Sequence, residues 1–166
     1  MLYSIKDLLN KIKVLMTVEA PEWRTVLLSP NEVLKVWHLI EADIEKALTH
    51  GINEITILDM CKQALANKIF IFITLDRDNK IVCTTTLRFL NYGQVKTCQI
   101  ITNTTNGIPL KQVEHDHQVF EDFAKQNGCS HMQVWGRKGW QRRLQSLTSR
   151  QGNKYKPLYY VFDMEI

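Results

Sequence analysis

Arginine and glycine gather in one short stretch, residues 128–144, which reads GCSHMQVWGRKGWQRRL. Two glycines bound a tight turn, and the guanidinium groups around it belong to Arg137, Arg142 and Arg143. Guanidinium groups bind phosphates and carboxylates through paired hydrogen bonds. The stretch is therefore compatible with an anion site for a coenzyme phosphate, a nucleic-acid backbone or an acidic protein partner. The alternative is a solvated helix face that makes minor salt bridges.

The same end of the chain is strongly basic. The segment from Phe123 to Phe162 holds eight basic residues and no acidic one, which leaves 13 basic and 17 acidic residues elsewhere. Aromatic residues lie among these cations: Trp135, Trp140 and Tyr155. Cations that contact phosphates and rings that stack on bases are typical of nucleic-acid binding. Against this hypothesis, Trp135 ends a segment that we predict to be a buried strand.

The histidines and carboxylates predict neither a metal site nor a catalytic pair. Glu114 and His117 form an E-x-x-H pattern, but such a site needs a matching second helix, and the sequence has none. We therefore expect no metal. His117 and Glu121 are four residues apart, and we expect them to pair on a helix surface. The catalytic residues stay unknown, because the sequence places no carboxylate beside a histidine in a catalytic arrangement.

The four cysteines, Cys61, Cys83, Cys98 and Cys129, lack the close spacing of metal ligands. Their apolar surroundings predict buried free thiols in a reducing compartment. The sequence has no apolar run long enough to span a membrane, and its first residues do not resemble a signal peptide.

Periodicity predicts two helices and then a run of strands. Ser29, Pro30 and Glu32 form a strong helix start, and an apolar stripe continues to Leu48. A shorter helix follows Thr56 and runs to about residue 67. Residues 69–73, 81–90 and 95–102 then read as three antiparallel strands joined by polar turns.

The second half predicts a crossover. After a loop over residues 103–109, a helix is expected over 110–127, with Gly128 as its stop. A strand over 131–135 should then lie parallel to the strand before that helix. A helix over 139–149 and a strand over 158–165 close a single α/β domain. Residues 1–24 are an N-terminal arm or an extra strand, near residues 13–18.

This order and several motifs resemble the GNAT acetyltransferase superfamily. The resemblance is most specific at two motifs, A-x-x-x-G-C, residues 124–129, and G-R-x-G-W-x-R-x-L, residues 136–144. Both resemble motifs of a family of small GNAT-like proteins encoded by bacteriophages and prophages. The resemblance implies a mixed, mostly antiparallel sheet with a central crossover helix and a closing C-terminal strand. It also implies a location in the virion or the host cytoplasm.

The resemblance implies acetyl-CoA as cofactor, with its pyrophosphate at the turn before the central helix. The candidate residues are Asn103, Thr105, Asn106, Gly107, Arg137, Arg142 and Arg143. The turn departs from the family pattern, because it has one glycine and no arginine, and Pro109 lacks an N–H donor. Glu114 and Asp116 add negative charge, and the tyrosine that often protonates the leaving thiolate is missing from residues 136–147. The sequence therefore favours a degenerate acetyl-CoA site.

Three functions remain open on the sequence alone. The favoured hypothesis is a virion-associated or host-directed protein that binds a phage structural or host protein. The second is an active N-acetyltransferase with a divergent pyrophosphate loop, and the third is nucleic-acid binding through the basic C-terminal face. The sequence leaves open whether the protein is an enzyme, and it does not identify the acceptor, the partner or the oligomeric state.

Overall fold

The computed structural model describes residues 22–50, 54–135 and 140–158. The chain divides into two compact units, one ending at Trp135 and the other beginning at Gly136. Within the described residues, no helix has the length and apolar character needed to cross a membrane.

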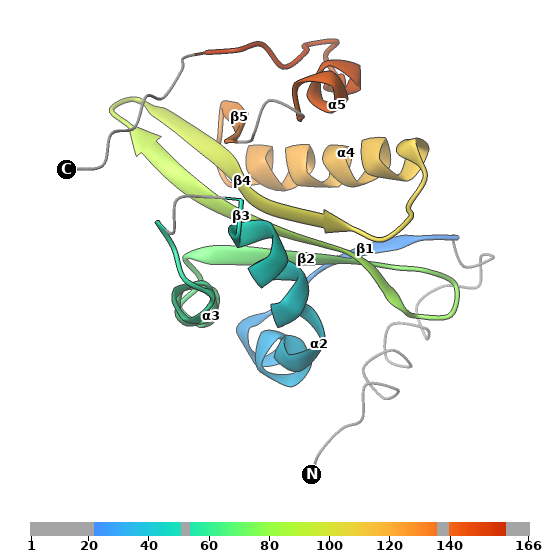
Figure 1. The fold of residues 1–166 in the computed structure, drawn as a ribbon. Coiled ribbons are helices and arrows are strands. Elements are labelled where there is room, and N and C mark those ends of the chain that lie inside the picture. The colour runs from blue at the N-terminus through green and yellow to red at the C-terminus, as the bar shows by residue number, and fades with distance from the viewer. Residues whose placement is uncertain (1–21, 51–53, 136–139, 159–166) are drawn as a thin grey trace. The chain divides into compact units, whose positions relative to one another are not determined.

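The first unit is built on a five-stranded sheet whose strands follow the chain order (Figure 1). The strands are β1 (Arg24–Leu27), β2 (Ile69–Leu75), β3 (Ile81–Tyr92), β4 (Val95–Thr105) and β5 (His131–Val134). Neighbours from β1 to β4 are antiparallel, and β5 is parallel to β4. A mixed sheet with one parallel pair requires a crossover, which the helix between β4 and β5 supplies.

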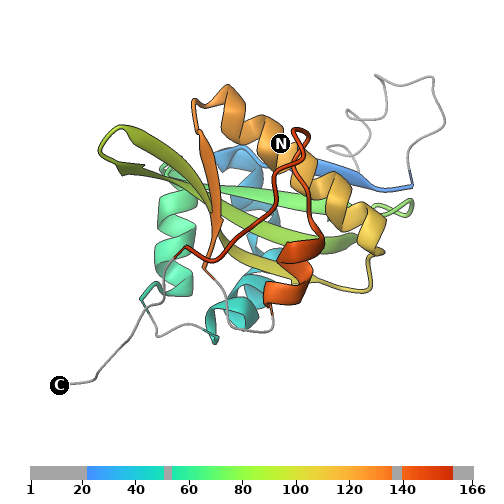
Figure 2. The ribbon, with the colours of Figure 1, turned by 90° about the horizontal axis from the view of Figure 1, so that it is seen from above.

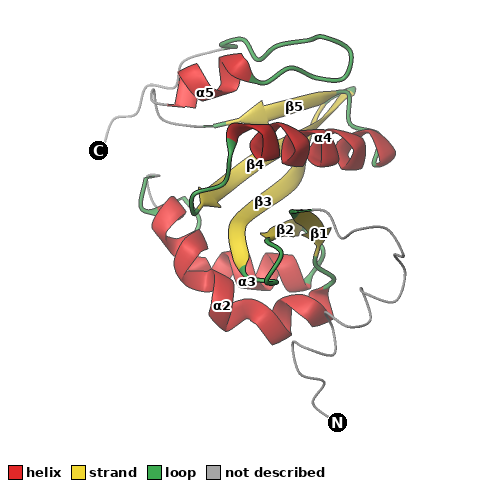
Figure 3. Cartoon of the chain, turned by 90° about the vertical axis from the view of Figure 1, so that its right-hand side faces the viewer, coloured by secondary structure: helices red, strands yellow, loops and turns green. Residues whose placement is uncertain are grey.

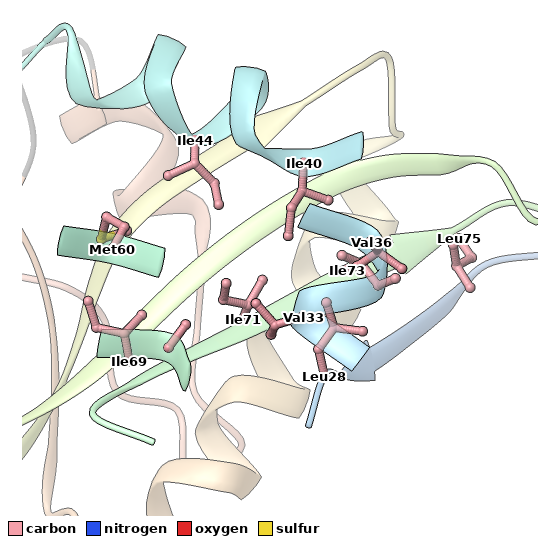
Figure 4. Packing of buried hydrophobic residues seen from close by; sticks show 11 residues of the cluster. Leu28, Val33, Val36, Ile40, Ile44, Met60, Ile69, Ile71, Ile73 and Leu75 are labelled. Atoms are coloured by element: carbon pink, nitrogen blue, oxygen red, sulfur yellow. The ribbon is translucent and has the colours of Figure 1, made fainter. Parts of the chain in front are cut away.

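Two helices, α2 (Pro30–Leu48) and α3 (Ile57–Leu65), cover one face of the sheet (Figure 3). Both begin with a reciprocal capping box, Ser29 with Glu32 and Thr56 with Asp59, as the sequence predicts. Their apolar sides pack on β2, where Ile40, Ile44 and Met60 are almost fully buried (Figure 4). Removal of this apolar surface from water is the main stabilising term on this face.

The crossover helix α4 (Leu110–Gln126) covers the other face and lies across the strands (Figure 2). It packs through a cluster of aromatic rings from β2, β3 and α4. The centroid of the Phe120 ring lies 5.1 Å from that of Phe72, and Phe123 contacts Phe70, Phe72 and Phe89. The helix ends before Gly128, whose φ of +77° is the left-handed conformation that glycine adopts most easily.

The predicted elements of the first unit hold, with four main differences. β1 was missed, because four residues from Arg24 to Leu27 carry little alternation. β4 continues through Thr105, so residues 103–105 are strand and not loop. β5 is half-buried rather than buried, and Trp135 is 50% exposed. The fourth difference concerns α3, which ends at Leu65. The strands predicted near residues 13–18 and over 158–165 fall outside the described residues, apart from Leu158, which is not in a strand.

The second unit contains one short helix, α5 (Trp140–Ser146), shorter than the predicted 139–149. A turn follows, in which Thr148 pairs with Lys154 as an isolated antiparallel bridge. The Ser149 hydroxyl accepts hydrogen bonds from the amides of Gln151 and Asn153, at 3.3 and 3.0 Å. The side chain therefore holds the turn closed.

Candidate active site

β4 and β5 pair over only part of their length. Their four Cα partners run from Thr97 with His131 to Ile100 with Val134, after which β5 ends and β4 continues to Thr105. A bulge begins the divergence, because Leu87 pairs with Ile100 while Thr86 pairs with Thr102, which leaves Ile101 as the extra residue. Along residues 101–105, backbone N–H and C=O groups that do not face β3 lie on an edge without a partner strand in the described chain.

The part of β4 beyond its pairing with β5 leads into a turn whose amide donors lack partners among the described residues. Gly107 has a φ of +74°, and Pro109 precedes the first residue of α4 without capping it through a side chain. Among the described residues, no hydrogen bond reaches the amides of Gly107, Ile108, Leu110 and Lys111. Unpaired amides at a helix start suit an anion, because the helix dipole is positive there.

The structure brings together only some of the predicted cofactor residues. Asn103, Thr105, Asn106 and Gly107 lie at the end of β4 and in its turn. The amide nitrogen of Asn103 donates to the Thr85 hydroxyl at 2.7 Å, so Asn103 has a structural role. Arg142 is exposed and Arg143 half-buried on α5, in the second unit, and Arg137 lies outside the described residues. Their participation stays a prediction.

Asp116 does not oppose an anion at this turn, contrary to the expectation from the sequence. Its side chain is buried against the sheet, with 3% exposure. The carboxylate accepts hydrogen bonds from the hydroxyl groups of Thr25 (2.5 Å) and Thr74 (2.8 Å) and from the Gln112 amide (2.6 Å). Asp116 therefore fastens the start of α4 to β1 and β2. Glu114, by contrast, is exposed.

His117 and Glu121 do not lie on a helix surface as predicted, since both are buried. Burial lowers the pKa of His117, and the charge of Glu121 partly opposes this effect. Glu121 forms an ion pair with Lys125, whose Nζ lies 2.6 Å from Oε1. Lys125 is thus one cation of the basic segment that already has an acidic partner. Over the residues that the structure describes, no three histidine, cysteine or acidic side chains could hold a metal.

The lowered pKa of His117 predicts a pH dependence of stability. Between the folded pKa and the ordinary value near 6.5, the unfolded chain binds more protons than the folded chain. The contribution of His117 is therefore complete above pH 6.5 and is lost as the pH falls through this value. We expect urea denaturation to show a smaller loss of stability between pH 7.5 and 5.5 in His117→Gln than in the wild type. Equal losses would contradict the prediction.

A row of polar side chains on the sheet was missed from the sequence. Arg88 pairs with Gln99 across β3 and β4, and Gln99 pairs with Gln133 across β4 and β5. The neighbouring Leu87, Cys98 and Met132 belong to the cluster under α4, so by strand alternation the row points to the opposite face. The signal in the sequence was an apolar residue between two polar ones, in T-L-R, residues 86–88, and in T-C-Q, residues 97–99.

Several solved structures with a similar fold are described as acetyltransferases. A protein described as a probable acetyltransferase has a TM-score of 0.64 and 13% identity, over 86% of this chain and 97% of its own. Ribosomal-protein-alanine N-acetyltransferase from Brucella melitensis biovar Abortus 2308 has a TM-score of 0.61 and 7% identity, over 87% and 99%. A predicted acetyltransferase from Clostridium acetobutylicum, solved with acetyl-CoA, has a TM-score of 0.57 and 11% identity, over 85% and 96%.

These similarities establish a GNAT-like α/β fold for the chain, as its sequence suggests. No family model matches the sequence, and no curated protein matches it either. At these identities the likeness concerns the fold, and function must be argued from the site.

Proposed function

We propose that this protein is an acetyl-CoA-dependent N-acetyltransferase with a divergent pyrophosphate loop. The observation that carries the proposal is the end of β4, which on its β5 side has no partner strand among the described residues and leads to a start of α4 without a side-chain cap. The similar fold of acetyltransferases, one of them solved with acetyl-CoA, supports the same conclusion. This proposal reverses the preference drawn from the sequence, where the atypical turn favoured a protein without catalytic activity.

The edge and the turn suit different parts of the coenzyme. Backbone groups along residues 101–105 offer donors and acceptors to the amides of the pantetheine arm, as an added strand would use them. The amides of Gly107, Ile108, Leu110 and Lys111 offer donors to the pyrophosphate. Lys111 is exposed in the first turn of α4 and adds a positive charge at this end of the helix. The coenzyme supplies the activated acyl thioester, and the protein orients it toward an amine.

The missing second glycine and Pro109 do not remove these donors. Pro109 stands at the cap position with φ −63° and ψ 152°, where it begins the helix without occupying the amides that follow. The Asp116 carboxylate is turned into the sheet, where it accepts hydrogen bonds from the Thr25 and Thr74 hydroxyl groups. The site therefore retains backbone donors despite its unusual sequence.

Replacing Leu110 with proline should weaken acetyl-CoA binding while leaving the fold intact. Proline is accepted at the first position of a helix, and the conformation of Pro109 suits a following proline. The substitution removes one amide donor, and a hydrogen bond to a charged group contributes roughly 1.5–3 kcal/mol. We expect the Kd for acetyl-CoA, measured by isothermal titration calorimetry, to rise about tenfold or more.

The control is Leu110→Ala, which removes the 52% exposed side chain and keeps the amide. It should bind acetyl-CoA like the wild type, within a factor of about two. Lack of acetyl-CoA binding by the wild-type protein near millimolar concentration would reject the proposed function. That result would favour the hypothesis drawn from the sequence, a GNAT-fold protein that binds a partner without catalysis.

A further inference from the structure

We infer that the row Arg88–Gln99–Gln133 binds a carboxylate on the acceptor, so that the amine substrate is also an acid. This inference rests on the proposed function, because it assigns the row to the acceptor of that reaction. Gln99 and Gln133 lie opposite each other, next to Ile100 and Val134, the last pair before β4 and β5 diverge. A carboxylate held there would place a nearby amine within a few ångströms of the divergence, since strands rise about 3.3 Å per residue.

The donors in this row outnumber its acceptors. Arg88 Nε donates to Gln99 Oε1 at 2.5 Å, which orients the guanidinium and leaves its terminal N–H groups without a partner among the described residues. Gln133 Oε1 accepts from the Trp135 indole at 3.4 Å. Both amide oxygens are therefore occupied, and both amide nitrogens remain as donors. A ligand that matches the row must supply acceptors.

The charge of the row also points to an acid. Arg88 is half-buried, yet no carboxylate among the described residues lies within ion-pair distance of it. Asp43 of α2 lies near this face: its carboxylate accepts a hydrogen bond from the Thr84 hydroxyl, and its backbone carbonyl accepts one from the Thr104 hydroxyl. Thr84 is four residues from Arg88, or about 13 Å along the strand. One unpaired guanidinium beside neutral amides suits a planar monoanion better than a phosphate dianion.

A buried hydroxyl beside the row is a second, independent indication of a ligand. Thr97 is fully buried, and its Oγ1 has no hydrogen-bond partner in the described chain. Thr97 lies two residues before Gln99, so the two side chains share one face of β4. An unsatisfied buried hydroxyl is destabilising, and a polar ligand on this face would supply its missing partner.

The test compares two probes that differ only in the charged group, N-acetylglycine and N-acetylglycinamide. Each is titrated into the protein without acetyl-CoA, while nuclear magnetic resonance follows the side-chain amide signals of Gln99 and Gln133. We expect the acid to shift these signals saturably and the amide to leave them unchanged. Arg88→Gln should weaken the response to the acid at least tenfold, and Arg88→Lys should weaken it less.

The matched control is Arg24→Gln. Arg24 is also half-buried and also donates to a side-chain oxygen, that of Asn79 at 2.5 Å, but it lies at the opposite edge of the sheet. The substitution Arg24→Gln removes the same charge from the chain as Arg88→Gln, but it should leave binding of the acid unchanged. Equal responses to the two probes, or an unchanged response in Arg88→Gln, would overturn the inference.

Catalysis adds a readout that separates this inference from the proposed function. With acetyl-CoA and a panel of amino acids and their amides, coenzyme A release should favour the acids by kcat/KM, and Arg88→Gln should abolish the preference while the Kd for acetyl-CoA stays constant. A wild-type protein that shows no such preference would count against the row as an acceptor site. If acetyl-CoA fails to bind, the proposed function falls, whereas the titration still decides whether the row binds carboxylates.

Discussion

Replacing Asp116 with alanine should lower the free energy of unfolding by about 3–5 kcal/mol. The carboxylate accepts hydrogen bonds from three side chains, Thr25, Thr74 and Gln112. Alanine removes this acceptor, so the three donors lose a hydrogen-bond partner in a largely buried region. Asp116→Asn keeps one acceptor oxygen, so about half of this cost is expected. Urea denaturation followed by circular dichroism measures both variants.

The control for Asp116 lies two residues away on the same helix. Glu114 is exposed, and Glu114→Ala should change stability by less than about 0.5 kcal/mol. A double-mutant cycle with Thr74→Val isolates the interaction between the carboxylate and β2. If Asp116→Ala costs less than 1 kcal/mol, the polar cluster does not fasten α4 to the sheet.

A comparably large loss, about 3–5 kcal/mol, is expected for Phe120→Ala. Phe120 is 3% exposed, and its ring meets that of Phe72 edge-on at 5.1 Å, so truncation leaves a cavity under α4. Phe120→Leu fills more of the space and should cost less than about 1.5 kcal/mol. The same denaturation experiment compares the two.

Phe120→Ala and Phe120→Leu both change α4, the helix whose start forms the proposed pyrophosphate site. Phe120 itself lies ten residues after the first residue of α4, so a folded Phe120→Leu protein should bind acetyl-CoA with little change. A cost for Phe120→Ala no larger than that for Phe120→Leu would show that the helix relaxes into the space. The position would then contribute less packing than its burial indicates.

The sequence predicts the fold well where a local signal coincides with burial. The capping boxes at Ser29 and Thr56 and the stop at Gly128 act through neighbouring residues, and each appears in the structure as expected. β1 could not be found in this way, because its four residues are stabilised as a strand by pairing with β2, which is distant in sequence. The end of β4 was missed for a similar reason: its last residues are polar but pair with β3.

The site was harder to predict, because a sequence motif specifies residue types but not the orientation of their side chains. Asp116 counted as a charge near an anion, whereas its side chain turns into the sheet. The turn appeared damaged without its second glycine, although backbone amides supply the donors. The row at Arg88 needs the register of three strands, which no single segment of sequence contains.

The burial of the cysteines has a practical consequence for colorimetric assays. Burial raises the pKa of Cys83 to about 11 and that of Cys98 to about 12, so both sulfurs stay protonated at neutral pH. Cys129 is also buried, and Cys61 is half-buried with a pKa raised by burial. Thiolates are the species that react with disulfide reagents. Coenzyme A released by the native protein can therefore be titrated continuously with such a reagent above a low and slowly rising background.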